Sequence, residues 1–158
     1  MLVATADHAL LTPQIVDYFC DEASRLSCDL AVGLTAYDAV MAEFPETRRT
    51  AIKFKDGAYS GCNLFGFLHH RSDRAAQFWR QIEQDRNKPL RMMRILGLWA
   101  IVRFLLRRIP LEEGLQLLSK KMQVRVRAVQ LPFPQAAIDV DTVDDWHFVQ
   151  SLAEKQTI

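Results

Sequence analysis

A chain of 158 residues has the length of one domain and can bury a substantial core. Its composition, 49% hydrophobic and 25% charged, is ordinary for a water-soluble globular protein. The formal net charge of +1 gives no overall field that would select nucleic acid or an anionic membrane, so any binding function must come from local groups.

The cysteines and the N-terminus indicate a cytoplasmic protein. The three cysteines, Cys20, Cys28 and Cys62, are odd in number and form no Cys-x-x-Cys pair, which argues against disulfides and a zinc site and favours a reducing compartment. The first residues carry no basic lead and reach an acid at Asp7, so we predict no signal peptide.

The first 36 residues predict a strand, a helix and a second strand. Residues 2–6 fit a short buried strand that ends at Asp7. Thr12 and Pro13 form an N-cap and a first helical position, and apolar residues then recur at helical spacing as far as Leu26. Residues 29–36 read as another buried strand, so we expect a parallel sheet covered by helices.

The middle of the chain predicts a hairpin followed by helices. Asp56 and Gly57 are a strong hairpin signal, preceded by an apolar run at residues 51–54 and followed by another at residues 62–68. A helix is predicted from Ser72, with Ala75, Phe78, Trp79 and Ile82 on its inner face.

Residues 90–108 form a predicted helical segment with apolar residues around the axis and arginines along its fringe. Its longest uncharged run is far shorter than the roughly 20 residues that span a bilayer, so we do not expect a membrane span. Apolar residues on all sides favour burial within the protein or an oligomer. An interfacial membrane helix and a lid or partner-docking surface are the other interpretations.

The last third predicts a helix, two strands and a final helix. A helix is expected over residues 111–120, and alternation over residues 123–128 predicts a half-exposed edge strand. Residues 136–140 read as a last strand, and Thr142 with Asp145 forms a capping box for the final helix. Without linkers or repeats, residues 1–158 are expected to form a single α/β domain.

Acidic residues follow the first and the last predicted strands. Asp7 ends the first strand, and Asp139 and Asp141 lie where the last strand gives way to a helix. Because ligands bind outside the carboxyl ends of strands in open α/β sheets, both places would meet at one edge if the strands are parallel. Carboxylates that converge there would suit Mg²⁺, completed by substrate phosphates. The alternative interpretation is that they are turn formers or helix caps.

Three segments resemble the MobA-like NTP transferases, the molybdenum-cofactor nucleotidyltransferase family. Residues 3–13, with Asp7, His8 and Thr12-Pro13, are similar to the family's x-D-x-P-L-L-T-P segment. Residues 136–146 are similar to its closing D-x-D-T-P-E-D-L segment, and residues 56–65 to its glycine-and-asparagine acceptor region. The segments occur in the family's order over nearly the whole chain.

The resemblance implies a GT-A-like or Rossmann-like α/β fold with a mixed, mainly parallel sheet between helices. It also implies transfer of a nucleotidyl group from an NTP, such as GTP or CTP, to a small molecule or cofactor precursor. By analogy, Asp7 and Asp141 hold the catalytic Mg²⁺, with Asp139 as neighbour or substitute, and Ser60, Gly61 and Asn63 line the acceptor site. His8 is a further candidate for contact with a substrate phosphate, because it adjoins Asp7.

The sequence departs from this family at its beginning. The family starts with a strand and a glycine-rich loop whose backbone N–H groups hold phosphates, and no closely spaced glycines occur here. We therefore expect a truncated domain, with apolar strand edges that favour a homo-oligomer or a partner chain. The alternative function is a non-catalytic binding or interaction module derived from the same fold.

The remaining candidates have simpler interpretations. His69 and His70 are expected in a solvated turn, and Cys62 as a buried structural thiol. Trp79, Trp99 and Trp146 stand at helical core spacing and are expected to pack inside.

Overall fold

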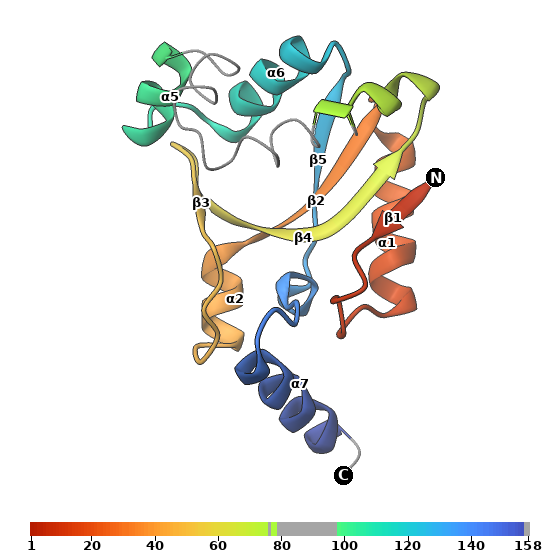
Figure 1. Cartoon of the computed structure of the whole chain (residues 1–158), viewed down its shortest axis with the longest axis vertical. Coiled ribbons are helices and arrows are strands. Elements are labelled where there is room, and N and C mark those ends of the chain that lie inside the picture. Colours follow the sequence, from red (N-terminus) through yellow and green to blue (C-terminus); the bar gives the residue numbers. More distant parts are fainter. Residues whose placement is uncertain (76, 79–97, 157–158) are drawn as a thin grey trace.

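The computed structural model describes residues 1–75, 77–78 and 98–156, and its centre is a five-stranded sheet (Figure 1). The strands are hydrogen-bonded in the order β1-β4-β2-β5, and β3 also pairs with β4. The bounds of the strands are β1 Leu2–Ala4, β2 Leu30–Ala36, β3 Ile52–Lys53, β4 Ala58–Phe67 and β5 Val126–Gln130. The helices are α1 Pro13–Arg25, α2 Tyr37–Glu43, η1 His70–Ser72, α5 Leu98–Leu105, α6 Leu111–Met122, η2 Pro134–Ala137 and α7 Val143–Gln156.

The mixed α/β fold is confirmed, and strand β4 accounts for its antiparallel part. β4 pairs antiparallel with β1, β2 and β3, whereas β2 and β5 pair in parallel. It follows that β1, β2, β3 and β5 all run in one direction and β4 alone runs in the other. The expectation of a mainly parallel sheet therefore holds for strand direction, but most of the hydrogen-bonded pairs are antiparallel because β4 lies between the others.

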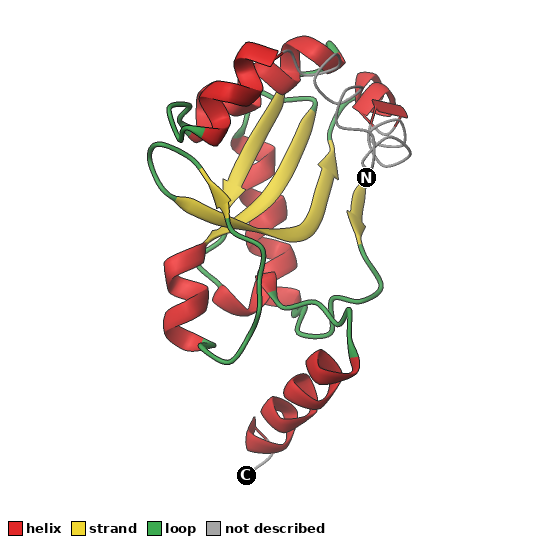
Figure 2. Cartoon of the chain, turned by 60° about the vertical axis from the view of Figure 1, so that its left-hand side comes forward, coloured by secondary structure: helices red, strands yellow, loops and turns green. Residues whose placement is uncertain are grey.

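Two apolar clusters cover the two faces of the sheet. Successive residues of β2 point to opposite faces: Ala31 joins one cluster, and Leu30 and Leu34 join the other. The first cluster takes in α1 and α2, and the second takes in α6 (Figure 2). Helices therefore lie on both faces, as the sequence predicts.

Helix α1 forms as its sequence signals predict. Thr12 is its N-cap, and the Thr12 hydroxyl accepts a hydrogen bond from the Ile15 N–H at 3.4 Å. Ile15, Phe19 and Ala23 are its buried residues. The strand before it is shorter than predicted, and the expectation that it is buried is wrong, because all of β1 is exposed at the end of the strand order.

The hairpin predicted at Asp56 and Gly57 joins β3 to β4. The pairs Ile52–Tyr59 and Lys53–Ala58 bracket the turn, and Gly57 has a φ of 158°. The Asp56 carboxylate also accepts a hydrogen bond from the Leu111 N–H at 3.0 Å, so it satisfies a free backbone donor at the start of α6. Helix α6 and the edge strand β5 are confirmed close to their predicted bounds.

Two of the tryptophans expected in the core lie outside it. Trp99 on α5 is 75% exposed and Trp146 on α7 is 53% exposed, so both predictions are wrong. Helical spacing shows which residues share a face, but it does not show whether another layer covers that face. Trp79 and most of the helix predicted from Ser72 lie outside the described residues.

The arginine-fringed segment is described only from residue 98 onward. In that part Phe104, Leu105 and Leu106 are exposed, so burial within this chain is wrong for them. Across the residues that the structure describes, no helix is both long and apolar enough to cross a bilayer.

The strand predicted at residues 136–140 does not form. The 3₁₀ helix η2 occupies its first half, and residues 138–141 have no regular structure. The sequence suggests a strand here because Ala136, Ala137 and Ile138 are apolar and buried, but in the structure they join the first cluster from a 3₁₀ turn and the residue that follows it. Helix α7 then extends beyond the rest of the chain, as both views show (Figures 1 and 2).

Candidate metal centre

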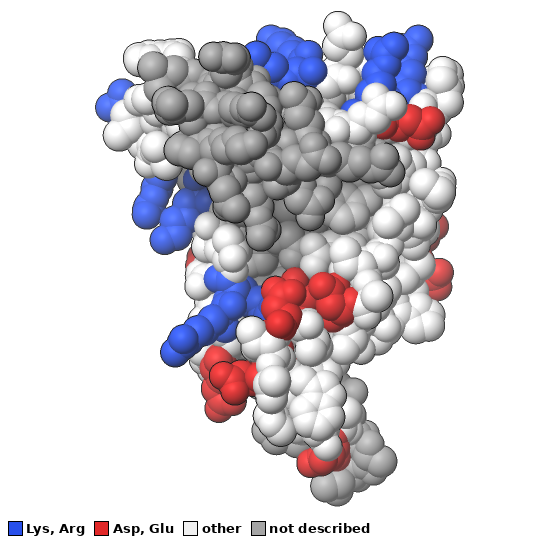
Figure 3. Space-filling model, in the orientation of Figure 1, with Lys and Arg blue, Asp and Glu red and all other residues white. Residues whose placement is uncertain are grey.

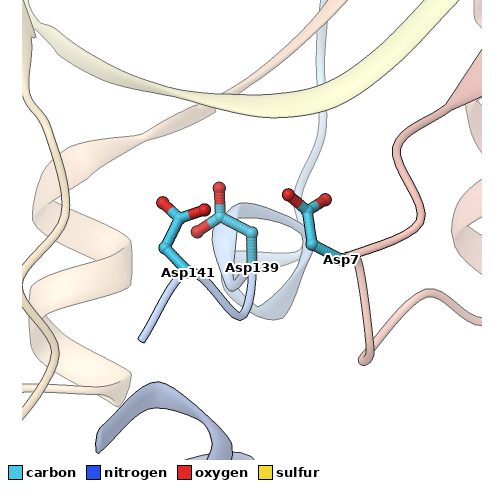
Figure 4. A group of neighbouring side chains, drawn as sticks. All are labelled: Asp7, Asp139 and Asp141. Carbon is cyan, nitrogen blue, oxygen red and sulfur yellow. The ribbon is translucent and has the colours of Figure 1, made fainter. Parts of the chain in front are cut away.

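Three carboxylates meet beneath the sheet, where the carboxyl ends of β1 and β5 lead into loops (Figure 4). Asp7 comes from the loop after β1, and Asp139 and Asp141 come from the loop between η2 and α7. One oxygen from each lies within 4.8 Å of the others. Asp7 and Asp139 are half-buried and Asp141 is exposed, so the cluster is open to solvent on one side.

The backbone ties the two acidic loops together. The Val140 N–H, between the two aspartates of the second loop, donates to the Asp7 carbonyl oxygen at 2.9 Å, and the Ala9 N–H donates to the same oxygen at 3.0 Å. The Thr5 hydroxyl donates to the Asp7 carboxylate. Although the last predicted strand is absent, this cross-link brings the two loops to the same edge of the sheet.

Asn63 in β4 forms a hydrogen bond with the Asp139 side chain. The pairing of β2 with β4 changes register between Val32 and Leu34, and Asn63 in β4 has a left-handed φ of 51°. Such a bulge re-aims a side chain, and here the Asn63 amide donates to Asp139 Oδ2 at 3.0 Å. Asparagine tolerates this backbone conformation better than most residues do.

Arg49, in the loop after α2, also binds Asp139 and links it to Asp145. Its guanidinium donates to the Asp139 carboxylate, to the Asp139 carbonyl oxygen at 2.8 Å and to Asp145 Oδ1 at 2.6 Å. The Asp145 carboxylate also accepts from the Thr142 N–H at 2.9 Å, and the Thr142 hydroxyl oxygen accepts from the Asp145 N–H at 3.2 Å, which together form the predicted capping box of α7. The Thr142 hydroxyl also donates to the Asp145 carboxylate at 2.6 Å. The Thr142 hydroxyl bond and the charge of Arg49 hold the pKa of Asp145 below its ordinary value.

The other predicted site residues lie at different depths. His8 is buried beside Asp7, and neither ring nitrogen forms a hydrogen bond of normal geometry with a described residue. Burial lowers the His8 pKa, while the charge of Asp7 and the backbone of Ala136 oppose this effect. Ser60 is buried, and its hydroxyl donates to the Thr50 carbonyl at 3.3 Å, whereas Gly61 is exposed.

Other residues confirm their simpler interpretations. Cys62 is 1% exposed, and burial raises the pKa of its thiol to about 12, as expected for a structural cysteine. His69 and His70 are exposed, with ring centroids 4.0 Å apart.

A polar pocket adjoins the carboxylates. It has a volume of about 460 Å³ and lies between the loop after α2 and the start of α7. In the space-filling view, acidic and basic side chains lie side by side on this face, just above the protruding helix (Figure 3). The lining residues are Glu46, Thr47, Arg48, Arg49, Asp141, Thr142, Asp144, Asp145 and Phe148.

The donor set suits a hard divalent cation. Carboxylates at this separation repel one another, by about 1–4 kcal/mol per pair near 4 Å at intermediate to high dielectric. A cation would reverse this repulsion, and Mg²⁺ commonly binds one or two carboxylates and takes its remaining oxygen ligands from water and phosphates. Asp7, Asp139 and Asp141 fit this chemistry, with Asp7 and Asp141 less constrained than Asp139, which Arg49 and Asn63 already contact.

Arg49 is the site residue that sequence reasoning misses. It belongs to a pair of adjacent arginines in a loop, and no periodicity or motif links it to Asp139, which is 90 positions away. The bend of β4 at Asn63 is likewise a tertiary feature, although the asparagine itself stands in the predicted acceptor region.

Comparison with known proteins yields one informative likeness. No protein-family model matches the sequence, and no curated protein matches it significantly. The fold is similar to the solved structure of a hypothetical transferase from Thermus thermophilus, with a TM-score of 0.81 and 30% sequence identity. The likeness covers 91% of this chain and 62% of that one, so this chain corresponds to less than two thirds of its structural neighbour.

Proposed function

We propose that this chain is a Mg²⁺-dependent nucleotidyltransferase-like domain. The enzyme would transfer a nucleotidyl group from an NTP, such as GTP or CTP, to a small molecule or cofactor precursor. The observation that carries the proposal is the convergence of Asp7, Asp139 and Asp141, with one oxygen of each within 4.8 Å of the others.

Two independent lines support this proposal. The three aspartates belong to the segments that resemble the MobA-like NTP transferases, and the fold brings them together from opposite ends of the chain. The structural neighbour, at 30% identity, is itself described as a hypothetical transferase.

In the proposed reaction, the three aspartates have different roles. Asp7 and Asp141 would hold the cation beside the substrate phosphates, with Asp139 as their neighbour. In the reaction, an acceptor oxygen bonds to the α-phosphorus, the bond from this phosphorus to the pyrophosphate oxygen breaks, and pyrophosphate leaves. When bound, Mg²⁺ would supply neutralisation of the phosphate charge. Positioning and charge neutralisation can provide most of the catalysis in such transfers.

Isothermal titration with GTP and with CTP, each with and without Mg²⁺, tests the proposal. We expect Mg²⁺-dependent binding of at least one nucleotide, and loss of that binding in an Asp7→Ala, Asp141→Ala double variant. A matched control is the Asp17→Ala, Asp21→Ala double variant, which removes the same charge from the exposed side of α1.

The possible outcomes separate two functions. Metal-dependent binding that survives in the control but not in the site variant supports a nucleotidyltransferase site. A folded chain that binds neither nucleotide at any Mg²⁺ concentration would overturn the proposal in favour of the non-catalytic interaction module.

A further inference from the structure

The loop that carries Asp139 and Asp141 contains no regular structure, and among its side-chain contacts those of Arg49 are the most numerous. Residues 138–141 lie between η2 and α7. The Arg49 guanidinium contacts the Asp139 carboxylate, the Asp139 carbonyl oxygen and Asp145 Oδ1. The Arg49 side chain is 7% exposed, so these contacts are largely shielded from water.

The geometry of Arg49 is that of a fixed support. Its two terminal nitrogens donate to the acidic loop and to Asp145 in the first turn of α7, while its Nε is buried without a hydrogen bond to any described residue. The loop that presents Arg49 is anchored by the buried Phe44 and Thr47, whose hydroxyl donates to the Phe44 carbonyl at 2.9 Å. The backbone two residues before Arg49 is thus anchored in the core.

The contacts also divide the three aspartates by role. The Arg49 guanidinium donates to Asp139 Oδ1 and the Asn63 amide donates to Asp139 Oδ2, so both oxygens of that carboxylate already accept a hydrogen bond. Asp141, two residues further on, is exposed and forms part of the pocket wall. Asp7 keeps one oxygen that does not receive the Thr5 hydroxyl.

We propose that Arg49 is the positioning residue of this metal centre: it neutralises and orients Asp139 so that Asp141 faces Asp7 across the cation. This inference rests on the proposed function, and it adds a residue that neither the sequence motifs nor the structural likeness identifies. It makes Asp7 and Asp141 the direct ligands and Asp139 a supporting carboxylate. Residues that orient metal ligands through hydrogen bonds affect metal affinity strongly without contacting the metal.

A Mn²⁺ titration of the full chain tests the role of Arg49. The EPR signal of the free ion measures how much Mn²⁺ remains unbound, and so gives the affinity. We expect Arg49→Ala to weaken Mn²⁺ binding by about 10- to 100-fold, the usual effect of losing such a support. Arg49→Lys should restore only part of the affinity, because a lysine ammonium cannot reach both carboxylates with a planar fork.

Two controls separate positioning from general stability. Arg103→Ala removes another arginine fork, to Glu113 at 2.5 and 3.1 Å, far from the site along the chain, and should leave Mn²⁺ affinity unchanged. In an Asp139→Asn background, Arg49→Ala should cause a much smaller further loss, because the carboxylate through which it acts is gone. Circular dichroism shows whether each variant is folded, and Mn²⁺ binding is measured at a temperature at which all of them are.

Each result decides the question. If Arg49→Ala binds Mn²⁺ as tightly as the unmodified chain, the inference is overturned while the proposed metal site stands. If the unmodified chain binds no Mn²⁺, or binds it equally well without Asp7 and Asp141, the proposed function is overturned as well. Should Arg49→Ala not fold, unmodified affinity in a folded Arg49→Lys variant would overturn the inference.

Discussion

At the scale of single residues, Asp29 shows how one buried carboxylate joins two strands. It precedes β2, and its side chain, 5% exposed, accepts from the Arg125 N–H at 2.9 Å and from the Arg125 guanidinium at 3.2 and 3.3 Å. The backbone of Asp29 in turn donates to the Arg125 carbonyl at 2.8 Å. These bonds, the side-chain bond from Arg125 foremost, lower the pKa of Asp29, so the folded state favours its charged form.

The stabilisation by Asp29 should therefore depend on pH. Its folded-state pKa lies below the unfolded value of about 3.9, so the full contribution is present above that pH and is lost as the pH falls through the folded pKa. We expect Asp29→Asn to lower the free energy of unfolding at pH 7 by about 1–2 kcal/mol, toward the low end for charged hydrogen bonds because Arg125 is exposed.

Urea unfolding of Asp29→Asn and the unmodified chain at pH 7 and near pH 3 measures this difference. The difference in the free energy of unfolding between the variant and the unmodified chain should be smaller at the lower pH. Asp17→Asn, on the exposed side of α1, serves as the control and should show little difference at either pH. A gap that is equal at both pH values would contradict the assignment.

At the scale of elements, the bulge in β4 links the sheet to the site. Pairing with β2 shifts between Val32 and Leu34, and the residue that absorbs the shift is Asn63, with its left-handed φ of 51°. The same residue donates its side-chain amide to Asp139. One irregularity in a strand thus aims a donor at the acidic loop, which is a frequent use of bulges beside functional sites.

Two substitutions at position 63 separate the backbone from the side chain. Asn63→Gly keeps easy access to a positive φ, whereas Asn63→Ala places a Cβ in a conformation that costs about 1–2 kcal/mol. We therefore expect Asn63→Ala to lower the free energy of unfolding more than Asn63→Gly does, as measured in urea.

The two variants should differ in stability but not in their loss of metal affinity. Both variants lose the amide that donates to Asp139, so both should bind Mn²⁺ more weakly than the unmodified chain does. Equal stability of the two variants would show that the left-handed backbone carries little strain. Unchanged Mn²⁺ binding in both would show that the amide contact is dispensable.

At the scale of the whole molecule, the sheet is covered on both faces but ends in an exposed strand. The two apolar clusters lie on opposite faces, yet β1 stands at the end of the strand order with all its residues exposed. Leu2 and Val3 are 36% and 37% exposed. An exposed apolar edge strand offers free backbone donors and acceptors to another chain.

Self-association through β1 stays a prediction, and sedimentation velocity over a range of protein concentrations can test it. We expect the unmodified chain to form larger species as its concentration rises. Val3→Lys should reduce this association, because a charge on an edge strand disfavours pairing with another strand. A monomer at every concentration would contradict the prediction and would leave β1 as a tolerated free edge.

Local signals in the sequence were sufficient for the elements whose causes are local. Thr12-Pro13 predicts the start of α1, Asp56-Gly57 the hairpin, and Thr142 with Asp145 the capping box, because each depends on bonds between residues close in the chain. The convergence of Asp7 with Asp139 and Asp141 was also predicted, but from a strand at residues 136–140 that does not form. The two loops meet through the Val140 N–H bond to the Asp7 carbonyl oxygen instead.

Only the tertiary structure decided the features that depend on distant partners. Residues 136–140 look like a strand in sequence but fold as a buried turn, because burial alone makes a run apolar. Trp99 and Trp146 look like core residues in sequence, but they are 75% and 53% exposed. Arg49 meets Asp139 across 90 positions of sequence, and such a pairing is set by the packing of the loop after α2, which no local pattern encodes.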